Sequence, residues 1–202
     1  FRRVLFRSLS LLDPHHERVA DVQNNRGIAL GKLRRFRSAE KALHHTLEIR
    51  KRIKRLRTTA TNGNNDIALS LSSSFEATEA IVSVLHNIAN VHRAAGEPSE
   101  ALRALMEAKT ILQQEQGDDD CNDNGDLRDR YWRQSAHLST AIGHVHYESG
   151  SLVDARECYQ EALEVLCGRL LLSLSSSSLG WREKRTKTAE QEARSEEHTS
   201  EL

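Results

Sequence analysis

Histidines are the first residues in this sequence with the chemistry of a metal or catalytic site. Ten are present, and His137 and His144 share one face of an expected helix. About 10 Å of helix rise separates these two, which is too far for both to bind one ion. His44 and His45 are adjacent and point to different sides. No cysteine or carboxylate pair completes a site, so we expect no metal.

An acidic loop is expected between Gly117 and Asp126, in the run Gly-Asp-Asp-Asp-Cys-Asn-Asp-Asn-Gly-Asp. Asp118, Asp120 and Asn122 alternate like the start of a calcium-binding loop. The glycine and the closing glutamate of such a loop are misplaced. We therefore expect a solvated acidic loop, with calcium binding as the alternative.

A basic run occupies residues 50–57, Arg-Lys-Arg-Ile-Lys-Arg-Leu-Arg. Ile49, Ile53 and Leu56 make one side of the expected helix apolar and leave the cations on the other. Such a surface can contact nucleic acid, an acidic membrane or an import receptor. It can also be a solubilising helix end, because cations suit the C-terminus of a helix. Attraction to the acidic residues 115–129 within the chain is a further possibility.

Other chemistry is not indicated by the sequence. It contains no glycine-rich phosphate loop, nucleophile elbow or HExxH motif, so we expect no enzyme, no cofactor and no small-molecule substrate. The three cysteines, Cys121, Cys158 and Cys167, form no even disulfide framework, which favours reduced thiols in an intracellular, cytoplasmic protein. No apolar run is long enough to span a membrane.

The composition favours helix. Of 202 residues, 38% are hydrophobic but only 4% are aromatic, and the chain has two prolines. Much Ala, Leu, Glu and Arg with few aromatic residues is typical of helical proteins. The length suffices for one domain with a sizeable core. We therefore predict an all-α protein.

Apolar periodicity and helix-breaking residues predict six helices that form successive pairs. The expected domain covers residues 9–172, with paired helices at about 17–56, 76–116 and 128–172. Turn signals and serine-rich, low-complexity sequence predict loop insertions, the first of them at 58–74. Residues 173–193 are expected to be a low-complexity, charged tail.

The two ends of the chain are related through their codons. Residues 194–201 can be written in codons whose reverse complement translates as Phe-Arg-Arg-Val-Leu-Phe-Arg-Ser, which is the sequence of residues 1–8. Both ends resemble a translated sequencing-library adapter. We therefore expect residues 1–8 and 194–202 to be artefacts and the natural part to be an internal fragment.

A frame of small residues recurs in the three helix pairs. Gly27 precedes Ala39 by twelve residues, Ala89 precedes Ala101 by twelve, and Gly143 precedes Ala155 by twelve. Small residues at these places allow two helices to approach closely. The alanines of successive pairs are 62 and then 54 residues apart.

This frame resembles the tetratricopeptide repeat, and within that family the longer repeats of kinesin light chains. The local match runs from Asn24-Asn25 through Phe36 and Ala39-Glu40 to Thr46-Leu47-Glu48-Ile49-Arg50. The resemblance implies an α-solenoid of three helix-turn-helix hairpins. Arg34, where a turn glycine is usual, and Pro98, where an aromatic residue is usual, depart from the pattern. The residues expected to pack the repeats are Gly27, Ala39, Leu43, Ala89, Ala101, Leu105, Ala108, Gly143, Ala155, Tyr159 and Ala162.

In this family the first helix of each pair lines a concave surface that holds peptides or helices. The resemblance therefore implies a protein-interaction scaffold with a protein or peptide partner. The residues that it places on the concave surface are Asn24, Ile28, Lys32, His86, Asn90, Arg93, His137, Thr140, His144 and Tyr147. Their amides, guanidinium and imidazoles could bond a peptide backbone or accept acidic side chains. The alternative is a merely solvated face.

Overall fold

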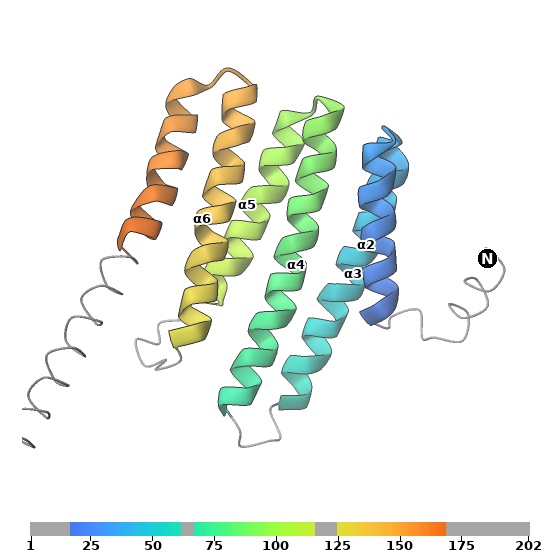
Figure 1. Cartoon of the computed structure of the whole chain (residues 1–202). Helices are drawn as coiled ribbons and strands as arrows, with labels where there is room; N and C mark the ends of the chain where they lie inside the picture. Colours follow the sequence, from blue (N-terminus) through green and yellow to red (C-terminus); the bar gives the residue numbers. More distant parts are fainter. Residues whose placement is uncertain (1–16, 62–66, 116–124, 169–202) are drawn as a thin grey trace, which may run out of the picture. The chain divides into compact units, whose positions relative to one another are not determined.

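The fold is helical throughout the residues that the computed structural model describes, which are 17–61, 67–115 and 125–168. The labelled helices are α2 (Glu17–Lys32), α3 (Phe36–Thr61), α4 (Ile67–Ala95), α5 (Pro98–Gln114) and α6 (Gly125–Glu148). A further helix covers residues 152–168 and is the orange ribbon of Figure 1. The predicted all-α class is confirmed. The adapter-like ends, the charged tail and residues 117–124 of the acidic loop lie outside the described residues. The loop was predicted to extend to Asp126, which was wrong for Gly125 and Asp126, because these two residues begin α6.

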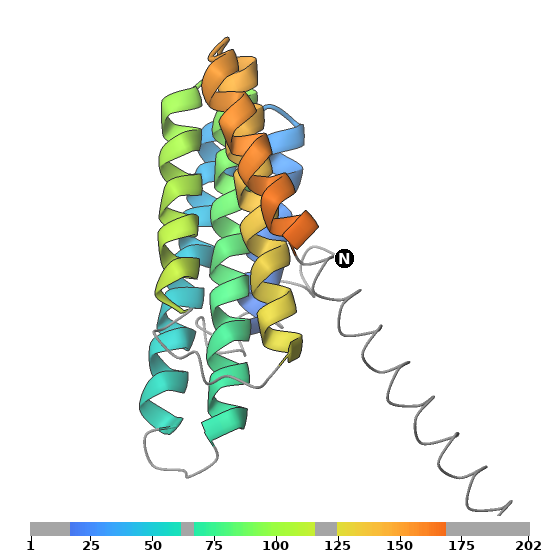
Figure 2. The same ribbon diagram turned by 90° about the vertical axis from the view of Figure 1, so that its left-hand side faces the viewer.

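Consecutive helices pack in pairs within the first of two compact units, residues 1–162. α2 packs on α3, α4 on α5, and α6 is followed directly by the helix at 152–168. Contacts of α3 with α4 and of α5 with α6 join one pair to the next. The first helices α2, α4 and α6 lie along one face, with α3 and α5 behind them (Figures 1 and 2). This is the predicted solenoid of three sequential hairpins. In the second unit, the structure describes only residues 163–168, which are helical.

The same turn closes each hairpin. Arg34, Gly96 and Gly150 have φ of 56°, 81° and 85°. At each turn this residue donates its N–H to a carbonyl three residues back, and the next residue donates to one five residues back, at distances from 2.9 to 3.1 Å. This pair of bonds is the Schellman motif, which caps helix carbonyls and favours glycine at the left-handed position. Arginine therefore occupies a glycine conformation in the first turn.

Arg34→Gly is expected to raise the free energy of unfolding by about 0.5–1 kcal/mol. Arginine has a Cβ that disfavours positive φ, and glycine removes this strain at some cost in unfolded-state entropy. Urea unfolding followed by circular dichroism measures the difference. Arg35→Gly is the matched control, since it removes the same charge without relieving a positive φ. Equal effects of the two changes would contradict the strain at Arg34.

The small-residue frame lies where the two helices of a hairpin meet. A Cβ at Gly27 would stand 2.6 Å from Cγ of Leu43, and a Cβ at Gly143 would stand 2.7 Å from Cε1 of Tyr159. No real Cβ approaches a carbon so closely. Among the residues expected to pack the repeats, Tyr159 is half-buried and the others are buried, namely Gly27, Ala39, Leu43, Ala89, Ala101, Leu105, Ala108, Gly143, Ala155 and Ala162.

The predicted insertion at 58–74 is helical over much of its length, so that prediction was wrong for residues 58–61 and 67–74. The hydroxyls of Thr58 and Thr59 donate to carbonyls of the preceding turn, from Lys54 and Arg55, at 3.2 Å. Hydroxyls bonded in this way fit inside a helix. Packing of α3 on α4 then outweighs the weak helix propensity of serine and threonine. Residues 62–66 lie outside the described part.

Candidate functional site

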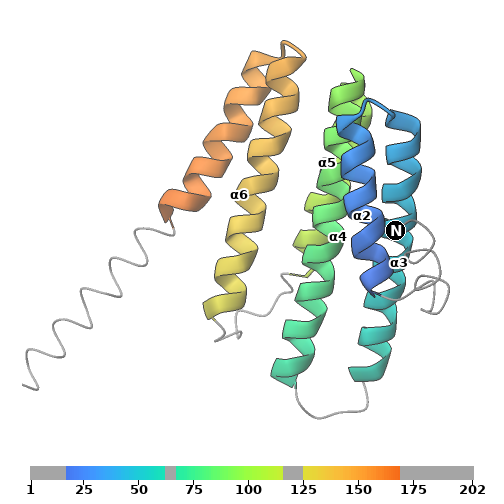
Figure 3. The ribbon, with the colours of Figure 1, turned by 45° about the vertical axis from the view of Figure 1, so that its right-hand side comes forward.

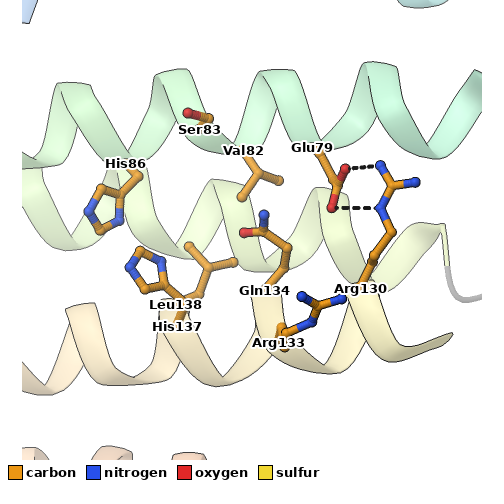
Figure 4. Close-up of a pocket in the computed structure, with 9 residues that line it drawn as sticks. All are labelled: Glu79, Val82, Ser83, His86, Arg130, Arg133, Gln134, His137 and Leu138. Atoms are coloured by element: carbon orange, nitrogen blue, oxygen red, sulfur yellow. Dashed lines mark hydrogen bonds and ion pairs between the residues drawn. The ribbon is translucent and has the colours of Figure 1, made fainter. Parts of the chain in front are cut away.

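A cavity of about 640 Å³ opens between α4 and α6, on the face formed by the first helices of the hairpins. Side chains of α4 and of α6 line it from opposite sides (Figure 4). Along each helix the lining residues recur at intervals of three and four residues, which places them on one face of that helix. The lining residues are Glu79, Val82, Ser83, His86, Arg130, Arg133, Gln134, His137 and Leu138.

An ion pair closes one end of this cavity. Arg130 donates from two guanidinium nitrogens to the two carboxylate oxygens of Glu79, and the Nε–Oε1 distance is 3.4 Å. The guanidinium also lies 5.3 Å from the centroid of the Phe75 ring, within the range of a cation–π contact. The bond to Glu79, more than any other interaction, raises the pKa of Arg130. Glu79 is the only carboxylate among the lining residues. Its negative charge is neutralised by this ion pair.

Two imidazoles form the other end. The rings of His86 and His137 lie 4.8 Å apart at an angle of 31°. Nδ1 of His86 is buried and has no hydrogen-bond partner among the described residues. Burial, and then the nearby His137 and Arg93, lower the pKa of His86 to about 4. This imidazole is therefore neutral at pH 7.

Arg133 and Gln134 stand between the two ends (Figure 4). Arg133 is exposed, and its Nε donates to the carbonyl of Asp129 at 3.3 Å. Its remaining guanidinium donors have no carboxylate partner among the described residues. Because Arg130 satisfies the carboxylate of Glu79, the cavity carries an excess of positive charge and of N–H donors. Such a site can accept a carboxylate or another small anionic group.

The structure brings two of the predicted concave residues, His86 and His137, into this cavity. Arg93 lies nearby and pairs with Glu148 at 3.5 Å. The ring centroid of His144 lies 5.6 Å from that of Tyr159. His86 and Arg93 belong to α4, and His137 and His144 belong to α6.

Other members of the predicted set are engaged elsewhere or stand apart. Asn24 accepts a hydrogen bond of 3.0 Å from Asn87, which links α2 to α4. The hydroxyl of Thr140 donates to the carbonyl of Ala136 at 2.8 Å. Ile28 and Asn90 are half-buried, whereas Lys32 and Tyr147 are exposed.

Sequence reasoning missed Glu79, Arg130, Arg133 and Gln134. The helical period is the signal that could have found them. Gln134, Arg133 and Arg130 precede His137 by three, four and seven residues, and Glu79 precedes His86 by seven. Which of these side chains would be neutralised depends on the pairing of α4 with α6, which local sequence does not specify.

The stability of the fold should depend on pH through His86. Its pKa in the folded state, about 4, is lower than the 6.5 of an unperturbed histidine. The contribution of His86 to the free energy of unfolding is therefore fully present above pH 6.5. It falls as the pH decreases toward 4, because in that range only the unfolded chain binds a proton at this imidazole. With allowance for solvent around the partly exposed ring, the loss is about 1–2 kcal/mol.

Urea unfolding between pH 7 and pH 4 measures this dependence. In the His86→Gln variant, the part of the pH dependence due to this imidazole should disappear. Arg93 and His137 are the charged or titratable groups that act on it, and both are retained in the variant. Parallel curves for the two proteins would contradict the assignment to His86.

The basic run at 50–57 is largely occupied within the fold. Arg50 pairs with Glu17 at 2.6 Å and also with Asp21, and Lys51 pairs with Glu107 at 3.0 Å. Lys54 pairs with Glu115, and Arg57 pairs with Glu17 at 3.2 Å. These cations tie α3 to α2 and to α5. The expected attraction to acidic residues within the chain is present at Glu115, and the fold uses cations that an external contact through this run would need.

No group of three or more His, Cys, Asp or Glu side chains in the described part of the chain could hold a metal ion. The calcium alternative concerned Asp118, Asp120 and Asn122, which lie outside that part, as does Cys121. Burial raises the pKa of the Cys158 thiol. No helix in the described part of the chain is long and apolar enough to cross a bilayer.

The first two hairpins contain segments that match a known protein family. Residues 19–53 and 81–120 match the family model described as Tetratricopeptide repeat. These two segments are tetratricopeptide repeats. The first covers most of α2 and the first two-thirds of α3, and the second covers the C-terminal half of α4 and all of α5. No curated protein matches the sequence.

The third hairpin lies outside the two matched tetratricopeptide repeats but shares their construction. Gly143 faces Tyr159 as Gly27 faces Leu43. The Gly150 turn has the same two backbone bonds as the turn at Gly96. The cavity therefore lies between the first helix of a matched repeat and the first helix of a hairpin built in the same way.

Proposed function

We propose that the chain is a protein-interaction scaffold that holds an extended peptide on the face formed by α2, α4 and α6. The tetratricopeptide repeats support this function in general terms, since stacked helical hairpins offer extended surfaces for other proteins. The resemblance to the longer repeats of kinesin light chains points in the same direction. The observation that carries the proposal is the cavity between α4 and α6, which has an excess of positive charge.

The bound peptide places an acidic side chain in this cavity. Arg133 supplies a guanidinium with no carboxylate partner among the described residues, and a guanidinium binds a carboxylate through two parallel hydrogen bonds. His137 and the amide of Gln134 line the same space and add donors. The Glu79–Arg130 pair limits the cavity at one end and leaves Arg133 as the cation that a ligand meets.

Neighbouring polar residues hold the peptide backbone. The half-buried amide of Asn90 and the exposed imidazole of His144 follow His86 and His137 along the same two helices. Amides and imidazoles can donate to peptide carbonyls and accept from peptide N–H groups. The half-buried Ile28 on α2 extends the surface toward the first repeat. The proposed site therefore comprises Ile28, His86, Asn90, His137 and His144 from the predicted concave set, together with Arg133 and Gln134.

Selection from a random peptide-display library on the immobilised full chain tests this function. We expect enriched peptides to carry an acidic residue at a fixed position, and the Arg133→Ala, His137→Ala double variant to lose them. Arg103→Ala is the matched control, because Arg103 is 78% exposed and lies on α5, behind the proposed surface. Enrichment of peptides without acidic residues, or equal loss in the control, would contradict the proposal.

A further inference from the structure

The tip of the first hairpin carries a strongly basic surface that the proposed peptide site does not use. Lys32 ends α2, and Leu33, Arg34, Arg35 and Arg37 follow through the turn into α3. All five side chains are exposed, and Leu33 is 69% exposed. Figure 3 shows this turn at the end of the blue helix pair. We call these five residues the basic tip.

The cations of the basic tip have no acidic partner within the described residues. Glu40, the nearest carboxylate along α3, lies 3.8 Å from His44. The other two hairpin turns differ, because their carboxylates face cations or imidazoles. Glu97 lies 2.8 Å from His92, and Asp154 lies 3.7 Å from His146. Of the three described turns, the first therefore leaves several like charges together.

The fold gains little from these cations. Arg34 adopts a positive φ of 56° that glycine would adopt without strain. Arg37 lies in the first turn of α3, which has no acidic residue, although the electropositive N-terminus of a helix favours carboxylates. By contrast, four cations of the run 50–57 in the same helix, Arg50, Lys51, Lys54 and Arg57, form ion pairs with acidic residues of α2 or with Glu107 and Glu115. A role in binding accounts for the composition of the tip better than a role in folding.

We propose that the basic tip binds the surface of an anionic lipid bilayer. The tip is the end of a helix pair, and its five side chains are exposed to a surface that approaches this end. Lysine and arginine are attracted to anionic headgroups, and Leu33 can enter the boundary between headgroups and acyl chains. An apolar side chain among the cations has no partner on the phosphate backbone of a nucleic acid. The tip is a turn between two helices with all five side chains exposed, whereas an acidic peptide is better held in a groove.

Co-sedimentation of the full chain with phosphatidylcholine vesicles, with and without phosphatidylserine, tests the inference. Binding is expected only with phosphatidylserine, and it should weaken as salt is added. Each cation contributes about a fivefold change in affinity, so Arg34→Gln, Arg35→Gln and Arg37→Gln together should weaken binding about a hundredfold. Leu33→Ser alone should weaken it several-fold.

A second triple variant serves as the matched control. Arg52, Arg55 and Arg156 are exposed and lie away from the turn, and their replacement by glutamine changes the net charge equally. We expect this variant to bind vesicles nearly as well as the parent. Equal weakening in both triple variants, or vesicle binding that the tip variant retains, would overturn the proposal. Tighter binding to duplex DNA or RNA than to vesicles, unaffected by Leu33→Ser, would overturn it in favour of a nucleic acid.

Discussion

Leu105→Ala is expected to lower the free energy of unfolding by about 3–5 kcal/mol. Leu105 is 1% exposed and belongs to the main hydrophobic cluster, which includes residues of α3, α4, α5 and α6. It stands four residues after Ala101, as Leu43 stands four residues after Ala39. Truncation would leave a cavity at the centre of the middle hairpin, where neighbours from several helices cannot all move inward. Such a loss is a large share of the stability of a small domain.

Urea unfolding measures this loss, and Met106→Ala is the matched control. Met106 is the next residue of α5 and is 53% exposed. Its truncation should change the free energy of unfolding by less than about 0.5 kcal/mol. If Leu105→Ala costs less than about 1 kcal/mol, the middle hairpin does not form the core described above.

Gly27→Val is expected to lower the free energy of unfolding by about 2–3 kcal/mol. The Cβ alone would lie 2.6 Å from Cγ and 2.7 Å from Cδ2 of Leu43. Leu43 is fully buried among the residues of the main hydrophobic cluster, so its movement would disturb packed neighbours and we expect α2 and α3 to be pushed apart. Overpacking of this kind exceeds the small gain in helix propensity when glycine is replaced.

Ala29→Val in the same helix is the matched control for Gly27→Val. Ala29 is exposed, so this change introduces the same β-branched side chain without a steric clash, at a cost of about 0.5 kcal/mol. Thermal unfolding by calorimetry compares the two variants with the parent. Similar losses would show that helix propensity, and not the contact with Leu43, determines the effect.

Much of the fold could be predicted from the sequence because it depends on local patterns. The spacing of Gly27 and Ala39 recurs in Gly143 and Ala155, and this recurrence by itself indicates close helix pairs. Gly96 marks the end of a helix, since glycine favours the left-handed turn conformation. Arg34 shows the limit of this reasoning. Arg34 has the same left-handed turn conformation as Gly96 because of its position in the repeat and not because of its residue type.

The candidate site was less predictable because it depends on which helices become neighbours. Arg130 and Glu79 are 51 residues apart, and no local pattern indicates that they pair. For the same reason the sequence did not indicate which acidic residues the run 50–57 would meet, and Glu107, the partner of Lys51, lies on another hairpin. The serine-rich segment that precedes Phe75 looked like a loop, yet it is helical where α4 packs on α3.

The central functional claim is that Arg133 meets an acidic residue of a bound peptide. A double-mutant cycle measured by isothermal titration calorimetry tests it most directly. It combines Arg133→Gln in the full chain with replacement of the fixed acidic residue of a selected peptide by its amide. We predict a coupling free energy of about 1–3 kcal/mol, as for a direct charge-assisted contact. Additive effects, with coupling near zero, would contradict the assignment of the cavity between α4 and α6 as the binding site.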